Sequence, residues 1–437
     1  MPPMRPLVLA SSRPLRFAAF TALYFAQGVP IGLLTIALPA WLAQRGLGVA
    51  EIASYQGIIG LPWGLKLISG PLMDRFSFPA MGRRRPWVLG AQAGLTLAFA
   101  GLALVADPLA QLPLVIALGV LVTTCSALQD VATDGMAIDL LPEEERGRAN
   151  AFMAFGQAAG FSSFSILSGL LLARFGLGAA ALTAAGAVAL VLALVLLTRE
   201  RPGERALPWS AGEASPAAIR APASFAGIFR GLGRVLLLPM GLVVLLTECF
   251  VRLRDGIAIS VLPVVATQTL GFSAEGYASM QGGFGIAIAA LGLAIGPGID
   301  RYGAKRFFML GIALNLAVVL VFATTQPLWG SQAYVIALYV IASIFGQMVF
   351  VSFISCSMAV CWPPVAASQF AIYMSLSNLA RSLGAVAFAL VAPQLGVVGQ
   401  FYAMAALLAL AFVLISRFDL TPHRERLRAL DEAPTPY

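Results

Sequence analysis

The sequence predicts an all-α polytopic membrane protein, in which twelve transmembrane helices form two repeats of six. Of its 437 residues, 59% are hydrophobic and only 11% are charged, whereas a soluble protein carries about 25% charged residues. The mean hydropathy is +0.87, and apolar runs of about 20 residues, the length that crosses a bilayer, recur along the chain. This composition excludes a water-exposed surface over most of the length.

The apolar runs fall into two sets, separated by a segment rich in Arg, Pro, Ala, Gly and Ser. We expect helices near residues 16–43, 51–72, 86–106, 113–139, 149–172, 178–198, 236–269, 274–299, 305–325, 332–361, 366–392 and 396–416. The predicted organisation is an N-terminal six-helix bundle, a linker, a C-terminal six-helix bundle and a tail, at residues 1–198, 199–234, 235–417 and 418–437. The composition of the linker predicts an irregular, solvent-exposed connector that buries little surface.

The two sets of helices resemble each other in sequence. Residues 38–76 and 262–302 share a Leu-Pro pair, a glutamine (Gln56 and Gln281) and the pattern Gly-Pro-x-x-Asp-Arg, in the same order and at nearly constant spacing. Three shared landmarks favour an internal duplication over chance similarity. Repeats of this kind build many secondary transporters.

The positive charges indicate the orientation in the membrane. Lys and Arg number 28 against 20 Asp and Glu, and the basic clusters fall in the N-terminal segment, the linker, the tail and the loops after alternate helices. Because short cytoplasmic loops retain Lys and Arg, we expect both termini and the linker in the cytoplasm. The basic balance therefore predicts a lipid bilayer and no nucleic acid as partner.

Several classes of chemistry are excluded. The four cysteines lie in or beside apolar stretches without metal-ligand spacing, and the single histidine, His423, falls in the polar tail. A zinc site or a His-based catalytic triad therefore cannot form inside the membrane. Motifs for nucleotide binding or metalloprotease chemistry do not occur either, so we expect neither an enzyme nor a metal site.

Charged residues inside the predicted spans are candidates for substrate or proton binding, since each costs about 2.5–3.5 kcal/mol at the centre of a bilayer. Asp130 and Asp134 are four residues apart and share one face of a helix, beside Gln129. Lys66 supplies a base in an earlier span. Two like charges on one face favour a single proton held between them, so this carboxylate pair is the first candidate for proton coupling.

The second half carries a comparable group. Glu248, Arg252 and Asp255 form an acid–base–acid stripe at positions i, i+4 and i+7, and Arg381 lies in a later span. One interpretation is structural pairing between helices, because nearly balanced charges offset each other's burial. The other is a polar cavity with at least one protonatable carboxylate, for which Glu248 ranks second.

Two clusters of Pro and Gly predict weak points in the helices. Gln27 lies in the run QGVPIG and Trp63 in the run PWG. Such residues let a span bend and expose backbone groups where they line a cavity. Gln27 and Trp63 are therefore candidate cavity residues. Three further glutamines place polar side chains within predicted spans and are candidates as well: Gln56, Gln281 and Gln129.

The repeated Asp-Arg pairs predict a conformational latch. Asp74–Arg75 and Asp300–Arg301 each lie at the expected cytoplasmic end of a helix and precede a basic turn. An acid beside arginines can pair with a neighbouring helix and release as the two halves move. The alternative interpretation is charge that only sets the topology.

Three stretches of the first half resemble a known family. FAQGVPIG (25–32), GPLMDRFSFPAMGRRRPWVL (70–89) and SALQDVATDGMAIDLLPEEERG (126–147) are similar to the AmpG-like branch of the major facilitator superfamily, which includes muropeptide permeases, siderophore importers and acetyl-CoA transporters. By motif, the resemblance assigns Arg83, Arg84 and Arg85 to a cytoplasmic gating loop. It assigns Glu145 and Arg146 to the loop after the helix that contains Asp130.

The resemblance implies a proton-coupled importer of anhydromuropeptides in the bacterial inner membrane, working by alternating access as a monomer. The proton gradient would supply the energy, without a cofactor. Muropeptide permeases tend to be longer than this chain, and its opening is also similar to compact siderophore importers. An importer of siderophores or other amphipathic metabolites, and an uncoupled facilitator, therefore remain alternatives.

Overall fold

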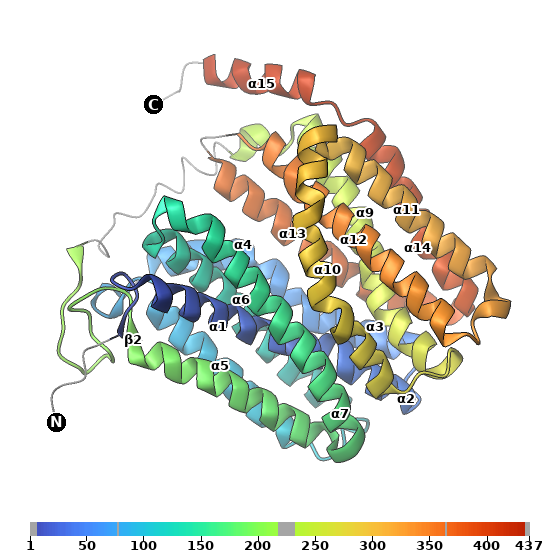
Figure 1. Cartoon of the computed structure of the whole chain (residues 1–437), viewed down its shortest axis with the longest axis horizontal. Helices are drawn as coiled ribbons and strands as arrows, with labels where there is room; N and C mark the ends of the chain where they lie inside the picture. Colours follow the sequence, from blue (N-terminus) through green and yellow to red (C-terminus); the bar gives the residue numbers. More distant parts are fainter. Residues whose placement is uncertain (1–6, 77, 217–231, 363–364, 433–437) are drawn as a thin grey trace. The chain divides into compact units, whose positions relative to one another are not determined.

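The computed structural model describes residues 7–76, 78–216, 232–362 and 365–432. Within these residues, every regular element is helical except one parallel pair, in which β1 (Leu7–Val8) lies beside β2 (Thr198–Arg199) (Figure 1). The predicted all-α class is confirmed for the described part of the chain.

The chain forms two compact units. The first comprises Met1–Gly48, Ile58–Pro222 and Ala266–Ile286, and the second comprises Val49–Gly57, Ala223–Val265 and Ala287–Tyr437. The predicted boundaries of the two six-helix bundles remain a prediction.

The first unit is built around helices from the first half of the chain. They are α1 (Arg13–Pro30), α2 (Leu38–Gln44), α4 (Lys66–Arg75), α5 (Arg85–Ala103), α6 (Leu112–Leu140) and α7 (Glu143–Leu197), joined by the start of α10 (Ala274–Tyr302). Helix α7 packs against both α1 and α5, and α6 packs against α5.

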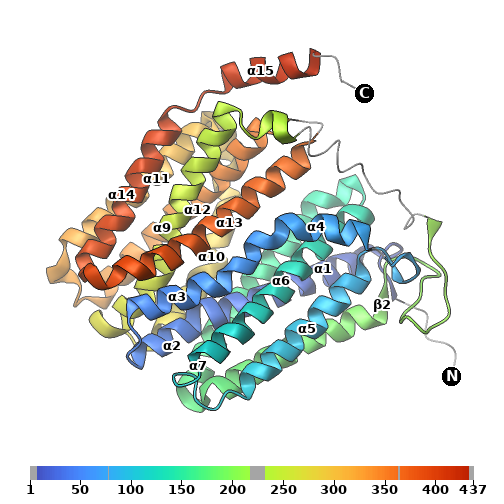
Figure 2. The ribbon, with the colours of Figure 1, turned by 180° about the vertical axis from the view of Figure 1, so that it is seen from behind.

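The second unit contains the helices of the second half and most of α3 (Val49–Gly60). They are α9 (Pro239–Val264), the remainder of α10, α11 (Ala304–Thr324), α12 (Gln332–Val360), α13 (Ala366–Val391), α14 (Val397–Ser416) and α15 (Leu420–Glu432). Helix α9 packs against α13 and α14, and α11 lies beside α14 (Figure 2).

Nine helical stretches of the described chain are long and apolar enough to cross a membrane. The stretch in α7 covers two of the predicted spans. The backbone of Gly176 (φ 77°, ψ −173°) is not helical and divides the stretch between them. Two predicted spans are not among the nine. The span predicted at 51–72 is divided by a 3₁₀ helix into α3 and α4, and the span predicted at 236–269 corresponds to α9, which carries four charged side chains. The structure thus supports a multi-pass helical protein, and the number twelve remains a prediction.

Both Pro/Gly clusters interrupt α-helical geometry, as predicted. Pro30 has no amide N–H, and the chain after it widens into a π-helix, Ile31–Ala37. The PWG run forms a 3₁₀ helix, Leu61–Leu65, directly before Lys66. The interruptions therefore adjoin two of the candidate residues, Gln27 and Lys66.

The start of the predicted linker is folded, which corrects the expectation of a solvent-exposed connector. Arg199 is paired in β2, and Glu200, Arg201 and Glu204 are buried. Glu200 is buried because it binds backbone N–H groups at the start of α5. Arg201 binds Glu200 and the carbonyl oxygen of Asp139, and Glu204 accepts the backbone N–H of Arg201. Residues 217–231 of the linker lie outside the described residues.

Candidate functional site

A close approach of α1 and α7 positions the polar side chains of the first unit. Gly156 and Gly160 are one turn apart on α7, and a Cβ at these positions would lie 2.3 and 2.2 Å from backbone oxygens of α1. Small residues at this spacing let two membrane helices touch backbone to backbone. As a result, Nε2 of Gln157 donates to Oε1 of Gln27 at 2.9 Å.

Asp130 of α6 is the centre of a buried network. Its carboxylate is paired with Nζ of Lys66 and accepts a hydrogen bond from Nε2 of Gln27. The same Nζ lies 4.6 Å from the centroid of the Trp63 ring, within the range of a cation–π contact. The structure thus brings together four candidate residues from three separate segments of the sequence, and Lys66 offsets the charge of Asp130.

Asp134 lies one turn further along α6 and has a different partner. Oη of Tyr24 donates a hydrogen bond to its carboxylate. In the described part of the chain, Asp134 forms no ion pair with a basic side chain. The two carboxylates of α6 are therefore not equivalent, since one is bound to a cation and the other to a hydroxyl group.

Gln129 supports this arrangement from the neighbouring face of α6. Its side chain is fully buried, and Nε2 donates to the carbonyl oxygen of Leu23 at 2.7 Å. Because Leu23 directly precedes Tyr24, this bond fixes α6 against the turn of α1 that holds the partner of Asp134.

The charged stripe of α9 forms one cluster in the second unit. Nε of Arg252 lies 2.6 Å from Glu248 and Nη1 lies 3.1 Å from Asp255. Ser377 of α13 joins the cluster, since its Oγ accepts from Arg252 at 3.2 Å and donates to the buried Glu248 at 3.3 Å. One guanidinium therefore serves both carboxylates.

Three further candidates lie on other helices. Nε2 of Gln56 is 3.5 Å from the carbonyl oxygen of Ile259, and Nε2 of Gln281 donates to Oη of Tyr277 at 2.8 Å. Both glutamines are buried. Arg381 of α13 is half-buried, and it forms no ion pair with any residue that the structure describes.

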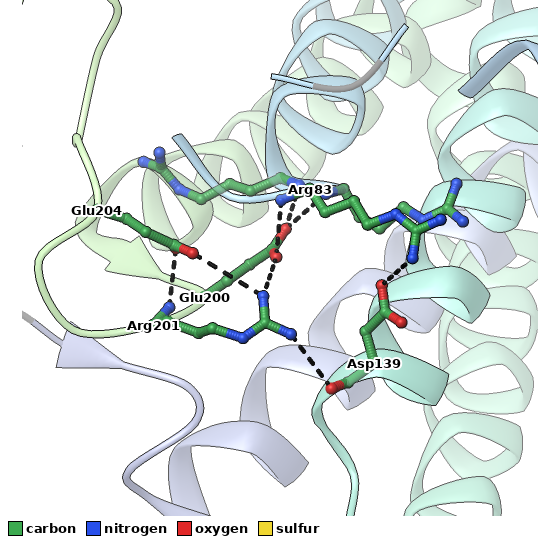
Figure 3. A network of polar contacts seen from close by, with 7 residues as sticks. Arg83, Asp139, Glu200, Arg201 and Glu204 are labelled. Carbon is green, nitrogen blue, oxygen red and sulfur yellow. Dashed lines mark hydrogen bonds and ion pairs between the residues drawn. The ribbon is translucent and has the colours of Figure 1, made fainter. Parts of the chain in front are cut away.

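A second polar network lies where the loop before α5 meets the end of α7 (Figure 3). The carboxylate of Glu200 is fully buried and accepts the backbone N–H groups of Arg83, Arg84 and Arg85 at 3.0, 2.7 and 2.6 Å. A carboxylate in this position satisfies N–H groups that have no partner within the helix. Gly82 permits the approach, because its φ is 96° and a Cβ would lie 2.7 Å from Cδ of Glu200.

The three arginines predicted to form a gating loop also have partners in this network. Arg85 is fully buried, and its guanidinium donates to carbonyl groups in the last turn of α7 and to that of Ala206, at 2.7–3.1 Å. Nη1 of Arg83 lies 3.5 Å from Asp139 of α6, and Arg84 is buried. These contacts hold α5, α6 and α7 together within one unit.

Glu145 also has a partner within the first unit. Its carboxylate forms a bidentate pair with Arg16 of α1, with Nε at 3.1 Å and Nη2 at 2.8 Å. Nη1 of the same arginine donates to the carbonyl oxygens of Leu9 and Ala10. Glu145 therefore joins the start of α7 to the start of α1.

The other gating candidates have no such role in the described structure. Arg75 and Arg146 are exposed, and Arg301 lies over the ring of the next residue, 5.3 Å from its centroid. The side chains of Asp74 and Asp300 lie outside the described residues, so the latch remains a prediction.

Four residues that complete these networks are not among the candidate site residues predicted from the sequence. They are Tyr24, Gln157, Ser377 and Glu200. Tyr24 lies three residues before Gln27 and so shares its face of α1, a spacing that could have identified it. Glu200 lies in the linker, where composition carries no such signal.

The site offers ion pairs and hydrogen bonds rather than a catalytic centre. Among the described residues, no three His, Cys, Asp or Glu side chains are grouped so that they could hold a metal ion. The arrangement can bind polar groups and can move a proton.

Comparison with known proteins places these features in a family. The chain matches the Major Facilitator Superfamily over residues 20–251 and 244–437. The anhydromuropeptide permease of Escherichia coli (strain K12) is 29% identical over 373 residues, which cover 84% of this chain and 72% of the permease. A putative transporter AmpG 4 of Rickettsia conorii is 26% identical over 137 residues, which cover 31% of this chain and 33% of that protein.

Solved structures show the same fold. The crystal structure of the nucleoside transporter NupG aligns with a TM-score of 0.68 at 13% identity, covering 92% of this chain and 98% of that one. Such relatives are transporters and not enzymes, and the chain is accordingly a multi-pass membrane transporter of a small molecule. The chain belongs to the Major Facilitator Superfamily, in its AmpG-like branch.

Proposed function

We propose that this transporter imports anhydromuropeptides across a bacterial inner membrane by alternating access, driven by the proton gradient. The substrate is suggested by the similarity to the Escherichia coli permease over 84% of this chain. The proton coupling is supported by one observation: Asp134 is held by the hydroxyl group of Tyr24, while the neighbouring Asp130 is held by Lys66.

In the proposed cycle, Asp134 takes up a proton on one side of the membrane and releases it on the other. No fixed cation pairs with Asp134 among the described residues, and a charged carboxylate is costly to keep in a membrane interior. Asp130 is less suited to this role, because losing its charge would leave Lys66 without a partner. Tyr24 keeps the Asp134 carboxylate in one orientation in either state, since a hydroxyl group can donate or accept.

The test uses purified protein in proteoliposomes and a radiolabelled anhydromuropeptide. Wild-type protein should accumulate the label under an inwardly directed proton gradient, and a proton uncoupler should abolish this. Asp134→Asn should still exchange label across the membrane but should not accumulate it. Asp107→Asn, in the exposed loop between α5 and α6, is the matched control and should retain both activities.

Three results would contradict the proposal. If Asp134→Asn accumulates substrate with normal proton dependence, the assignment to α6 is wrong and Glu248 becomes the candidate. If saturable wild-type uptake is insensitive to the uncoupler, the protein is an uncoupled facilitator. If wild-type protein neither accumulates nor exchanges the label, the substrate is wrong.

We further propose twelve spans, with both termini and the linker in the cytoplasm, in a functional monomer. The internal repeat and the distribution of Lys and Arg support this topology. In a cysteine-free background, Trp209→Cys, at a position 81% exposed, should react only with reagent added from the cytoplasmic side. Asp107→Cys should react only from the opposite side, and labelling of both from one side would refute the topology.

A further inference from the structure

The charged residues of α9 and α13 do not balance within the second unit. Two carboxylates, Glu248 and Asp255, are shared between Arg252 and Arg254, which lie 2.6–3.1 Å from them. Arg381 is a third cation and forms no ion pair with a residue that the structure describes. The cluster of these five residues, here called the α9–α13 cluster, therefore carries one positive charge without a counterpart in the described part of the chain.

Arg381 points away from the outer surface of α13. Leu383 and Leu390 of this helix are 47% and 76% exposed, as expected for side chains that face lipid. At 100° per residue, Arg381 lies about 200° from Leu383 and about 180° from Leu390 around the helix axis. It therefore lies on the opposite face of α13, one turn after Ser377, and a lipid headgroup is not its natural partner.

Close packing of α9 and α13 keeps Arg381 near the other charges of the cluster. A Cβ at Gly256 of α9 would lie 2.1 Å from the carbonyl oxygen of Arg381, and a Cβ at Gly384 of α13 would lie 2.6 Å from that of Leu253. The two backbones thus touch at Arg381 and again three residues later, at Gly384. The backbone of Arg381 therefore cannot move away from α9 without separating these helices.

An isolated guanidinium inside a membrane protein is costly unless an anion binds it. Arginine presents a planar fork of donors that binds a carboxylate through two parallel hydrogen bonds. The site retains accessible surface, since Arg381 is only half-buried. An anion that is not part of the chain can therefore reach Arg381 and bind it.

We infer that Arg381 binds a carboxylate group of the transported substrate, within the second unit. This inference rests on the proposed function, since the peptide part of an anhydromuropeptide ends in a carboxylate. It adds a specificity determinant: the acid form of the substrate is recognised and an uncharged analogue is not.

The direct test compares two ligands that differ in one group, an anhydromuropeptide with a free C-terminal carboxylate and the same molecule with a carboxamide. Binding to the full-length protein in nanodiscs is measured by calorimetry. Wild-type protein should bind the acid about 10- to 100-fold more tightly, the range expected for a hydrogen bond to a charged group. Arg381→Gln should bind both ligands as wild-type binds the amide, and Arg381→Lys should restore part of the preference.

The control is Arg417→Gln, at an exposed position after α14, which should keep the wild-type preference. If Arg381→Gln retains the preference for the acid, the inference is wrong. If it weakens both ligands equally, Arg381 has a structural role and the inference is also wrong.

Absence of binding of either ligand to wild-type protein would instead contradict the proposed substrate. In that case, the inference is tested by the reaction of Arg381 with phenylglyoxal, quantified by peptide mass spectrometry. N-acetyl-D-alanine should protect Arg381 and N-acetyl-D-alaninamide should not. Equal protection by the two compounds, or equal protection by inorganic phosphate, would overturn the assignment to a substrate carboxylate.

Discussion

Replacing Glu200 by alanine should destabilise the first unit strongly, although Glu200 has no part in the proposed proton transfer. The carboxylate accepts three backbone N–H groups at the start of α5 and lies 3.2 Å from Nη1 of Arg201. Its relative exposure is 0%, so water does not take its place without a structural change. Alanine would leave these donors buried without an acceptor.

The magnitude follows from the number of donors. Each buried donor left without a partner costs about 1–3 kcal/mol, and a carboxylate at a helix N-terminus contributes up to about 2 kcal/mol in a partly buried site. Some relaxation reduces the sum, so we expect Glu200→Ala to lower the free energy of unfolding by about 3–5 kcal/mol, as for other broken buried charge pairs. Glu200→Gln should cost less, because the amide oxygen can still accept from two of the N–H groups.

The assay is denaturant unfolding of the purified protein in mixed detergent micelles, followed by tryptophan fluorescence. Glu213→Ala is the matched control, because Glu213 is an exposed glutamate of the same segment, and it should change the free energy by less than about 0.5 kcal/mol. A loss below about 1 kcal/mol for Glu200→Ala, or a loss equal to that of the control, would refute the reasoning.

Two further predictions concern neighbouring charges. Burial raises the pKa of Glu204 from 4.5 to about 7, although the hydrogen bond from the backbone N–H of Arg201 lowers this pKa. Between these two pH values the folded state holds a proton that the unfolded state releases. The free energy of unfolding should therefore fall by about 3 kcal/mol as pH rises from 4.5 to 7. Glu204→Gln should remove this part of the slope in unfolding measurements at pH 5 and 8, and identical slopes would contradict the prediction. Arg16→Ala should lower the free energy of unfolding by about 2–4 kcal/mol, because it breaks the bidentate pair with Glu145. Arg13→Ala, whose side chain is 47% exposed and 3.9 Å from Glu145, should cost less than about 1 kcal/mol, and equal effects of the two changes would count against the assigned role of Arg16.

Helical spacing was sufficient to predict contacts within one helix. Glu248, Arg252 and Asp255 lie at i, i+4 and i+7, and the structure places both carboxylates on the one guanidinium. The partner of Asp130 could not be found in this way. Lys66 is 64 residues away in sequence, and the pair depends on how α4 and α6 pack.

Composition misled the interpretation of the linker because it averages over residues with different roles. The segment 199–234 is rich in small and polar residues, yet Glu200 and Glu204 at its start are fully buried. The motif GRRR is a second case. Resemblance assigned its arginines to a gating loop, but neither composition nor spacing predicted that Glu200 binds their three backbone N–H groups, or that the Arg85 side chain donates to carbonyl groups.

The Asp130–Asp134 network of the first unit and the α9–α13 cluster of the second hold opposite unbalanced charges among the described residues, and this difference connects the two proposals. In the first unit, Asp130 and Asp134 face one base, Lys66, so one carboxylate is in excess. In the second, Arg252, Arg254 and Arg381 face two carboxylates, so one cation is in excess. A proton on Asp134 removes the first imbalance, and a substrate carboxylate on Arg381 removes the second. Because an uncompensated charge is costly in a membrane interior, the fully loaded transporter is the state in which neither unit carries that cost. The two proposals together therefore predict that a proton and an acidic substrate move in the same cycle.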